Sequence, residues 1–487
     1  MENEMMEESP EAGGMETNAI EYPEQDNSNN DVDDTPLFVG EGDAVEVPVD
    51  DNNIPMEDDD DDDELENLIS DQEPIVDMAK VTISSHSDPV YAVACTTSTV
   101  DGTLRIVSGG GDDKAFWHDI PAAAVLQVQS TPLESHYQFK DSVSSVASNS
   151  PYVAFDTTKP PNPEWMAVGG LDGSVVLFGP GGKVLPLEGP SADIEWLCWH
   201  PKGGNVLLVG SSDATIWMFH TSLNKCLQVF VGHEDAVTCG AFSADGKVAL
   251  SASADGTLRI WAPKTGKSKH VFRFAAHDGT PPPALTCLAT HGGTDQQLVM
   301  VGGEDGQAHV CHVANKKQVA SLRHYDPTVQ PQNSNNNMED EEVMVPSGVE
   351  AVGFCKSNPN WCATGGMDGV LKIWDLANQG QCRHACRVNN ENTSQPQGDG
   401  ITKLQWHPTL PLVVTATCRG ELHLWDARNG QRIHTLTGHA DVINDMDVSF
   451  TPGVGTAAAG NAVVVTASDD KTVKVFQLDI DAVMAAP

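Results

Sequence analysis

One short pattern recurs eight times between about residue 79 and residue 478. Each copy begins with small residues, continues with Asp-Gly or a related pair, and ends in alternating apolar residues that close on an aromatic residue or Cys. The clearest copies begin at Ser253 and at Gly366. A unit repeated at intervals of about 40 to 60 residues predicts a repeat architecture rather than one irregular core. The copies span residues 112–117, 170–178, 212–219, 253–261, 304–311, 366–375, 419–426 and 469–476.

The Asp-Gly pair between two alternating runs predicts a tight β-hairpin. Glycine adopts the positive φ that such a turn requires, and Asp tolerates its neighbourhood. A hairpin per repeat, with room for two more strands, matches the four-stranded blade of a β-propeller. We therefore expect an all-β fold with a single eight-bladed β-propeller. Seven blades with one extra hairpin remain the alternative.

A second mark precedes two of the copies, because Gly232-His233 and Gly438-His439 stand upstream of them. Together the two marks resemble the WD-repeat family. That resemblance implies a buried hydrogen-bonded network of a His, a strand Ser or Thr, the turn Asp and the Trp. Phe476 replaces the Trp in the last copy, so its network is expected to be truncated. The implied groups are His233, Ser251 or Ser253 (with Ser253 preferred), Asp255 and Trp261, and then His439, Thr466 or Ser468 (with Ser468 preferred) and Asp470.

A propeller must close, since an open ring would expose sheet edges. The last repeat is followed by few residues, whereas Lys80-Val81-Thr82-Ile83 stands ahead of the first repeat. We expect residues around 79–84 to supply the outer strand of the last blade, so that the propeller occupies residues 79–487. Polar, irregular stretches at 151–163, 323–346, 389–399 and 451–461 are expected to be surface loops.

Residues 1–78 contain 29 Asp and Glu and no Lys or Arg, with an unbroken acidic run at 57–64. Such a segment buries too little apolar surface to offset the entropy of ordering, so we expect a disordered acidic tail. Two interpretations of the tail stay open: it solvates the protein, or it attracts a basic client.

The charge of the whole chain bounds the choice of partner. The net charge is −43, which leaves −14 for the remainder once the −29 of the tail is removed. Negative potential repels nucleic acid phosphates and anionic membranes, so we expect a basic protein as partner and no direct contact with nucleic acid or membrane. The 11 cysteines include no Cys-x-x-Cys pair, which favours free thiols in a reducing compartment. No signal peptide is recognised at the first residues, so we expect a cytoplasmic protein, with the nucleus also open.

The sequence offers no arrangement typical of catalysis outside the repeats, and we expect no enzyme activity, no metal and no cofactor. Cys382, His384 and Cys386 alternate on one expected strand. Three ligands on a strand without a fourth nearby are more typical of packing than of zinc.

Three short stretches, 110–116, 193–201 and 349–355, resemble the angio-associated migratory cell protein family and its yeast counterpart. The layout of an acidic tail followed by eight repeats agrees. The resemblance implies a chaperone of a basic large-subunit ribosomal protein in 60S assembly, although animal members are linked to migration and angiogenesis. We expect a monomer. Propellers of this kind usually bind through the start of each innermost strand and beside the turn Asp. The acidic residues at those places are Asp112, Asp193, Glu195, Glu234, Glu304 and Asp469.

Two other functions stay open. Residues 425–428 read Trp-Asp-Ala-Arg, a tetrapeptide shared by substrate receptors of cullin-type ubiquitin ligases. A signalling scaffold is the third possibility.

Overall fold

The computed structural model describes residues 75–97, 102–121, 129–133, 137–149, 165–179, 182–203, 205–274, 281–291, 297–325, 347–388, 400–451 and 460–485. The expected disordered tail lies outside the described residues, apart from its last four positions. The same holds for all or most of the four stretches expected to be surface loops.

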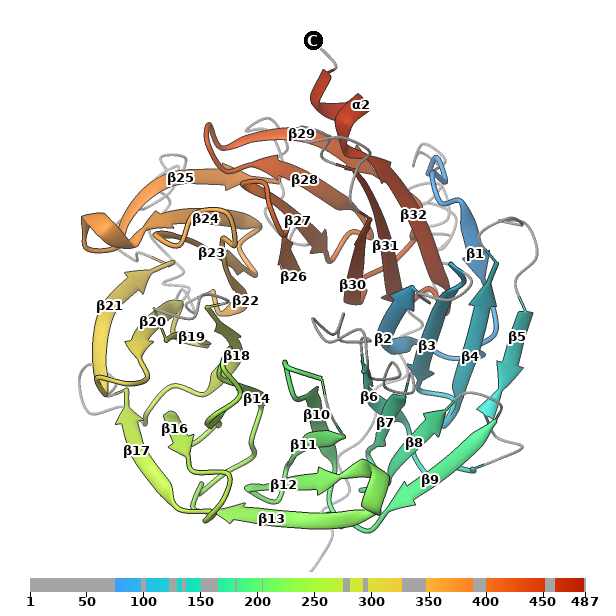
Figure 1. Ribbon diagram of the computed structural model, residues 1–487. Helices are drawn as coiled ribbons and strands as arrows, with labels where there is room; N and C mark the ends of the chain where they lie inside the picture. Colours follow the sequence, from blue (N-terminus) through green and yellow to red (C-terminus); the bar gives the residue numbers. More distant parts are fainter. Residues whose placement is uncertain are drawn as a thin grey trace, which may run out of the picture. The chain divides into compact units, whose positions relative to one another are not determined.

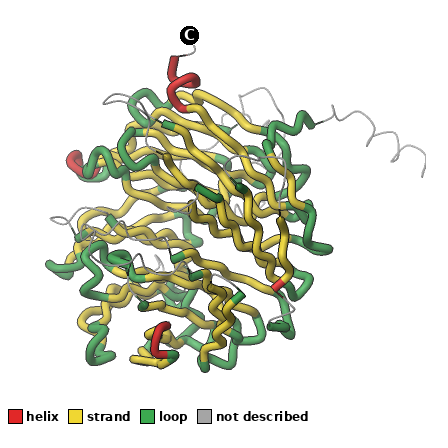
Figure 2. The backbone as a smooth tube through the Cα atoms, turned by 45° about the vertical axis from the view of Figure 1, so that its right-hand side comes forward, coloured by secondary structure: helices red, strands yellow, loops and turns green. Residues whose placement is uncertain are grey.

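The described chain forms eight four-stranded antiparallel sheets arranged in a ring (Figure 1). This confirms the eight-bladed β-propeller, and the seven-bladed alternative is wrong. Nearly all of the regular secondary structure among the described residues is strand, and helix is confined to short segments (Figure 2). No helix among the described residues is long and apolar enough to cross a membrane. The short helical segments are η2 (Thr221–Leu223), η4 (Leu376–Asn378) and α2 (Ile480–Ala485).

Within each blade the strands follow one another from the inside of the ring to the outside, except in the last blade. Blades 1 to 4 are β2 (Val90–Thr97), β3 (Leu104–Gly110), β4 (Ala115–Ile120), β5 (Gln129–Pro132); β6 (Val143–Ser148), β7 (Met166–Gly170), β8 (Val175–Gly179), β9 (Lys183–Leu187); β10 (Ile194–Trp199), β11 (Val206–Ser211), β12 (Thr215–His220), β13 (Lys225–Val231); β14 (Cys239–Phe242), β15 (Ala249–Ala252), β16 (Thr257–Trp261), β17 (Ser268–Arg273). Blades 5 to 8 are β18 (Leu285–Thr290), β19 (Leu298–Gly303), β20 (Gln307–His312), β21 (Lys317–Arg323); β22 (Val349–Phe354), β23 (Trp361–Gly366), β24 (Val370–Asp375), β25 (Gln381–Arg387); β26 (Ile401–Trp406), β27 (Leu412–Thr417), β28 (Leu422–Asp426), β29 (Gln431–Leu436); β30 (Ile443–Thr451), β31 (Asn461–Ser468), β32 (Val473–Asp479), β1 (Val81–Ile83).

The middle hairpin of every blade turns at the repeated Asp-Gly or its substitute. The second residue of each turn has a φ between +59° and +78°. Glycine adopts this conformation without strain, and five blades place Gly there. Blades 1, 3 and 8 instead place Asp113, Ala214 and Lys471 there. The repeated pair is therefore a backbone requirement of the hairpin.

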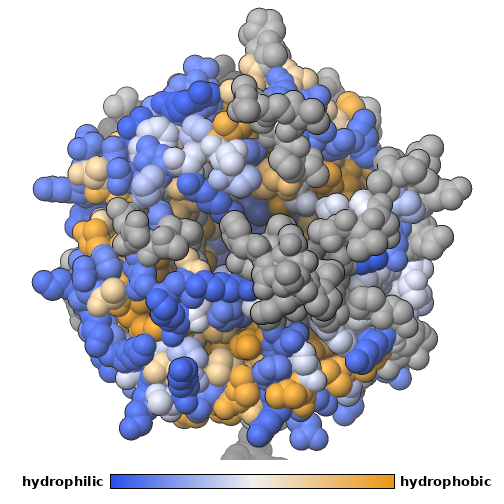
Figure 3. All heavy atoms as spheres, viewed as in Figure 1, coloured by the Kyte–Doolittle hydropathy of each residue, from blue (hydrophilic) through white to orange (hydrophobic). Residues whose placement is uncertain are grey.

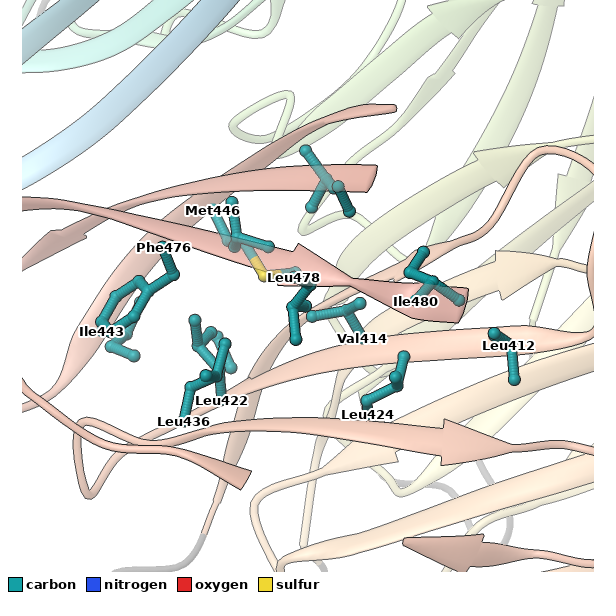
Figure 4. Close-up of a cluster of buried hydrophobic side chains, with 14 residues drawn as sticks. Leu412, Val414, Leu422, Leu424, Leu436, Ile443, Met446, Phe476, Leu478 and Ile480 are labelled. Carbon is teal, nitrogen blue, oxygen red and sulfur yellow. The ribbon is translucent and has the colours of Figure 1, made fainter. Parts of the chain in front are cut away.

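Apolar side chains pack between neighbouring blades rather than in one central core. Figure 4 shows one such cluster, in which Leu412, Leu424 and Leu436 of blade 7 meet Phe476 and Leu478 of blade 8. Alternating residues on the two middle strands of each blade face the next blade, so each sheet is buried on both sides. Close approach at the centre requires small residues, because a Cβ on Gly210 or Gly240 would overlap the Trp196 ring.

The ring closes through strands from both ends of the described chain. β1 pairs antiparallel with β32, with Val81 opposite Val475. The backbone N–H of Met78 donates to Thr437 O of blade 7 (2.9 Å), and the Lys474 ammonium donates to the Asp77 carboxylate. Lys474 is buried, so this ion pair fixes the segment before β1 against the last blade. We call this ion pair the clasp.

A second seam lies between the innermost strands of the first and last blades. The carboxylates of Asp445 and Asp447 on β30 accept hydrogen bonds from the backbone N–H groups of Val93 (3.0 Å) and Cys95 (2.8 Å) on β2. The Asn444 side chain donates to Val90 O (3.0 Å). Side chains thus join residues about 350 positions apart in the sequence.

Candidate functional site

In four blades, a buried His bonds to the Asp of the middle hairpin turn. In blade 4, His233 Nδ1 lies 2.9 Å from the Asp255 carboxylate and Nε2 lies 2.7 Å from Ser251 Oγ, which also accepts from Trp261 Nε1 (2.8 Å). Hydrogen bonds to His233 and Thr257 lower the pKa of Asp255 against the opposing effect of burial, which is the largest single influence. Every polar group of the set has a partner, as a buried network requires.

The strand hydroxyl of this network is Ser251, not the preferred candidate Ser253. Ser253 lies just beyond β15, where its hydroxyl donates to Asp235 O (2.9 Å) and accepts from Asp255 N (3.1 Å). In blade 8 the hydroxyl is likewise Thr466, which lies 2.7 Å from His439 Nε2, whereas Ser468 donates to Asp441 O. The two preferred serines therefore support the turn instead of the histidine.

Blade 8 lacks the tryptophan, and its network is correspondingly shorter. His439 Nδ1 lies 2.7 Å from the Asp470 carboxylate, and the Phe476 ring packs 6.3 Å from the His439 ring without a hydrogen bond. Hydrogen bonding to His439 lowers the pKa of Asp470, again opposed by burial.

Two further networks were missed by the sequence patterns. In blade 1, His86 lies 2.8 Å from Asp112 and 2.9 Å from Ser108. In blade 6, His324 lies 3.2 Å from Asp368 and 2.7 Å from Thr364. Neither His follows a glycine, so the Gly-His signal was absent. Their spacing of 26 and 44 residues before the turn Asp is the remaining signal.

Asp112 was expected to contact a partner, and the structure corrects this. Its carboxylate is 3% exposed and binds His86 and the backbone N–H of Ser87 (3.0 Å). The side chain is therefore part of the blade 1 network and does not face solvent.

The middle hairpins of all blades and the connections between blades lie on one face of the propeller, which we call the turn face. A channel runs inward along the innermost strands, with a cavity volume of about 420 Å³. Residues of all eight innermost strands line it. On the face seen in Figure 3, hydrophilic residues gather along the outer edge of the propeller and hydrophobic residues lie further in.

The second residue of each innermost strand is displaced by a β-bulge in seven blades. The register shifts there, for example between Ile194 and Trp196. A bulge changes the direction of a side chain. Where the bulged residue is Ser or Thr, it bonds to the next blade: Ser144 Oγ donates to Ile194 O and Thr402 Oγ1 donates to Ile443 O (2.7 Å). The position is thus normally used to join blades.

Glu195 and Glu350 occupy this position in blades 3 and 6. An ionised carboxylate cannot donate to the neighbouring carbonyl, and neither side chain has a hydrogen bond or ion pair with a described residue. Both line the channel. Burial raises the pKa of Glu195, and the nearby charge of Asp193 raises it further. Burial also raises the pKa of Glu350. The charge of Glu304 raises it further, whereas the charge of Lys403 lowers it. Glu195 is exposed and Glu350 is half-buried, and neither carboxylate forms an ion pair with a described residue.

Three other acidic candidates lie in the connections and turns of the turn face. Asp193, Glu234 and Glu304 are exposed. Asp193 and Glu304 are the charges that act on Glu195 and Glu350, so they lie beside them. Asp469 is partly exposed and accepts a hydrogen bond from Asn444 (2.7 Å), which joins it to the seam between blades 8 and 1. Of the six acidic candidates, four face solvent freely.

One cation shares the channel with these carboxylates. Lys403 on β26 lies 3.4 Å from the Asp445 carboxylate. Asp445 raises the pKa of Lys403, although burial acts against it. The ion pair partly neutralises the wall formed by blades 7 and 8, so the negative potential is concentrated toward blades 3 to 6.

Two large apolar side chains are exposed on the turn face beside the acidic groups. Tyr91 is 40% exposed and lines the channel, and Met367 is 46% exposed at the turn of blade 6. Aromatic and Met side chains are typical anchors of protein interfaces. The turn face therefore combines negative charge with apolar contact area.

The remaining motifs are accounted for by the fold. Cys382 is exposed, Cys386 is buried, and His384 Nε2 lies 3.1 Å from Arg428 O of the next blade. Among the described residues, no group of three or more potential metal ligands was found. Arg428 forms a two-pronged ion pair with Asp426, Nε to Oδ1 at 2.9 Å and Nη2 to Oδ2 at 2.7 Å.

Comparisons with known proteins agree with the geometry. The WD domain, G-beta repeat family matches residues 224–262, 346–375 and 430–477. Angio-associated migratory cell protein from dog and from human is 32% identical over 401 residues, which covers 82% of this chain and 80% of the relative.

Solved structures are similar in fold at lower sequence identity. The crystal structure of Saccharomyces cerevisiae Sqt1 matches with a TM-score of 0.64 and 18% identity, covering 82% of this chain and 99% of that chain. Chaetomium thermophilum Sqt1, bound to the N-terminus of the ribosomal protein L10, matches with a TM-score of 0.59 and 18% identity, covering 83% and 100%.

Proposed function

From the premise that this chain belongs to the angio-associated migratory cell protein family of WD-repeat propellers, we propose that it is a non-catalytic chaperone that holds a basic ribosomal protein on its turn face. The observation that carries the proposal is the pair of channel-lining carboxylates, exposed Glu195 and half-buried Glu350, whose pKa values are raised by burial and which form no ion pair with a described residue. Desolvated charges of this kind contribute to binding only when an opposite charge meets them.

The surroundings of the pair suit a flexible basic segment. Exposed Asp193, Glu234 and Glu304 provide rim charges that speed association with a positively charged chain. Tyr91 and Met367 provide apolar contacts next to them. The Chaetomium thermophilum Sqt1 structure, which has a similar fold, holds the N-terminus of ribosomal protein L10. We propose the corresponding segment as the client of this chain.

The expected location is the cytoplasm, where a ribosomal protein meets its chaperone after synthesis. We also propose that the protein acts as a monomer. The ubiquitin-ligase alternative has no specific observation in its favour, since Arg428 of the Trp-Asp-Ala-Arg tetrapeptide forms an ion pair with Asp426 within its own turn. A signalling scaffold has no specific observation in its favour.

The proposal is tested by measuring binding of a synthetic N-terminal peptide of ribosomal protein L10 to the full-length protein by isothermal titration calorimetry. Glu195→Lys places a positive charge where the client's cation would sit, and we expect an affinity loss of at least about tenfold, since like-charge contacts are strongly unfavourable. Glu188→Lys makes the same change at an exposed residue after β9, outside the channel wall. We expect less than about a threefold loss there, because isolated surface charges contribute little.

Circular dichroism of both variants controls for folding. Equal losses for Glu195→Lys and Glu188→Lys would show that the channel mouth is not the site. No measurable binding of the peptide by the wild-type protein would reject the client itself.

A further inference from the structure

The face opposite the turn face carries charge of the other sign. This face holds the turns between the first and second strands and between the third and fourth strands of each blade. In blades 3 to 5 these turns and the strand ends beside them contain seven lysines and, among the described residues, one carboxylate, that of Asp245. We call the six lysines without an ion pair the lysine arc: Lys202, Lys225, Lys264, Lys267, Lys316 and Lys317.

All six side chains of the lysine arc are exposed, and none lies within salt-bridge distance of a described carboxylate. The seventh lysine, Lys247, is 3.1 Å from Asp245. The Asp245 carboxylate also accepts hydrogen bonds from Ser243 Oγ (2.7 Å) and Gln297 Nε2 (3.0 Å). Its negative charge is therefore paired with neighbouring groups and not with the lysine arc. Burial raises the pKa of Asp245, but the hydrogen bonds from Ser243 and Lys247 and the charge of Lys247 lower it to about 2. The arc therefore keeps its full positive charge.

The turns that carry the arc touch one another from blade to blade. His200 Nε2 of blade 3 lies 3.1 Å from Gly246 O of blade 4. Gln297 of blade 5 donates to Asp245 of blade 4. A Cβ on Gly266 of blade 4 would overlap the Gln228 side chain of blade 3. Because the turns are contiguous, the six lysines form one curved surface rather than scattered charges.

We propose that the lysine arc is a docking surface for the phosphate backbone of single-stranded RNA. Net charge alone predicted no direct contact with nucleic acid, but net charge is a sum and does not describe its distribution. A local surface of one sign attracts a polyanion even on an acidic protein, at distances comparable to the Debye length of about 8 Å. The docking surface lies on the face away from Glu195 and Glu350, so a basic client and RNA do not compete for the same residues.

The composition of the arc favours phosphates over an acidic protein. Protein interfaces depend on apolar or aromatic anchors at their centre. The described turns that carry the arc expose one large apolar side chain, Leu223, and no aromatic one. Lysine ammonium groups are point charges that pair with phosphates without reading bases. We therefore expect binding that is independent of sequence and strongly dependent on salt.

The test uses fluorescence anisotropy of a labelled 20-nucleotide oligouridylate with the full-length protein, across about 25 to 200 mM salt. Each contact between a cation and a single-stranded phosphate adds about −0.7 to the slope of log K against log salt. The variant Lys264→Gln/Lys267→Gln/Lys316→Gln removes three contacts and is expected to reduce the magnitude of the slope by about 2. The control Lys80→Gln/Lys140→Gln/Lys471→Gln makes the same charge change at exposed lysines outside the arc. It is expected to change the slope by less than about 0.5.

Three results would overturn the proposal: no binding of the oligouridylate at about 25 mM salt, an equal change of slope in the control variant, or binding that is as tight to a labelled poly-glutamate of the same length. The last result would identify an acidic protein as the occupant. The proposal does not depend on the client of the turn face, because the arc variant should still bind the L10 peptide within about twofold of wild type.

Discussion

At the scale of single residues, the hydrogen-bond partners of the buried histidines show whether these side chains contribute to stability or to binding. His233 stands between a carboxylate and a hydroxyl that itself accepts from Trp261, so a change of one atom affects three residues. His86, His324 and His439 likewise lie between a carboxylate and a hydroxyl, and in blade 6 that hydroxyl also accepts from Trp374 Nε1 (2.9 Å). None of these groups lines the channel, so the networks act on stability rather than on binding.

Ser251→Ala tests the hub of the blade 4 network. The change leaves Trp261 Nε1 and one nitrogen of His233 without their partner, and both residues are buried. We expect the free energy of unfolding to fall by about 2 to 3 kcal/mol, because each unsatisfied buried group is unfavourable by about 1 to 3 kcal/mol. Urea denaturation followed by tryptophan fluorescence measures it. Ser268→Ala on the exposed strand β17 is the matched control, and equal midpoints for the two variants would contradict the role of Ser251.

The turn carboxylates make stability depend on acid pH. The pKa values of Asp255 and Asp470 lie below the unfolded value of 3.8, because each accepts hydrogen bonds from a His and a Thr. A lowered native pKa gives stability that is fully present above about pH 4 and is lost as pH falls toward the native pKa. Asp470→Asn should therefore reduce the free energy of unfolding at pH 7 and make it fall less steeply between pH 4 and pH 2. Parallel curves for variant and wild type would contradict this.

The sequence predicted the His, Asp and Trp of the blade 4 network, but it did not predict which serine bonds to the His. Ser251 and Ser253 are two positions apart, so both point to the same side of an extended strand and periodicity does not separate them. The strand ends at Ala252, and this end makes Ser253 part of the turn. Asp112 was misplaced for a similar reason, since its role as a buried partner depends on His86, which no Gly-His pair marks.

At the scale of the element, the middle hairpins set the architecture. A backbone requirement repeated eight times leaves a strong mark in a sequence, and this is why the blades and their number were predictable. The β-bulges of the innermost strands leave no such mark, because Tyr, Ser, Glu, Thr and Asn all occur at the bulged position. Glu350 differs from most other bulged residues in that those residues bond to the next blade, and no sequence pattern marks this difference.

Ala214→Gly tests the turn requirement. Ala214 has a φ of +66° at the position where five other blades have Gly. A non-glycine residue is strained there by about 1 kcal/mol, so glycine should raise the free energy of unfolding by about that amount. The reverse change, Gly256→Ala, should lower it by more, since its Cβ would lie 2.4 Å from Pro282 Cβ. Thermal unfolding followed by circular dichroism distinguishes the two signs, and a lower midpoint for Ala214→Gly would reject the argument.

At the scale of the whole molecule, charge is divided between two faces. The carboxylates of Glu195 and Glu350 line the channel on the turn face, and unpaired lysines gather on the opposite face of blades 3 to 5. The net charge of −43 predicted a negatively charged surface, but it gave no sign of the lysines on the opposite face. Topology explains the difference, because antiparallel strands place alternate turns of one blade on opposite faces.

Ring closure can be tested at the clasp. Asp77→Asn removes the partner of Lys474, whose side chain is 7% exposed. We expect a loss of about 1 to 2 kcal/mol, less than for a fully buried pair because Asp77 itself is 45% exposed. Hydrogen exchange should become faster in β1 and β32 first. Asp88→Asn breaks the exposed pair with Lys471 (3.7 Å) and should change little. Uniform exchange rates in the Asp77 variant would contradict the clasp.

The pairing of β1 with β32 also fixes the order of events during translation. The ribosome makes β1 near the start of the chain and β32 almost 400 residues later, so at synthesis rates of about 5 to 20 residues per second the first strand has no partner for at least about 20 s. Seven blades can assemble while the nascent chain emerges, but the eighth is incomplete until β32 has been made. A prematurely terminated product would therefore retain most of its sheets, expose an unpaired edge, and be a target for proteolysis.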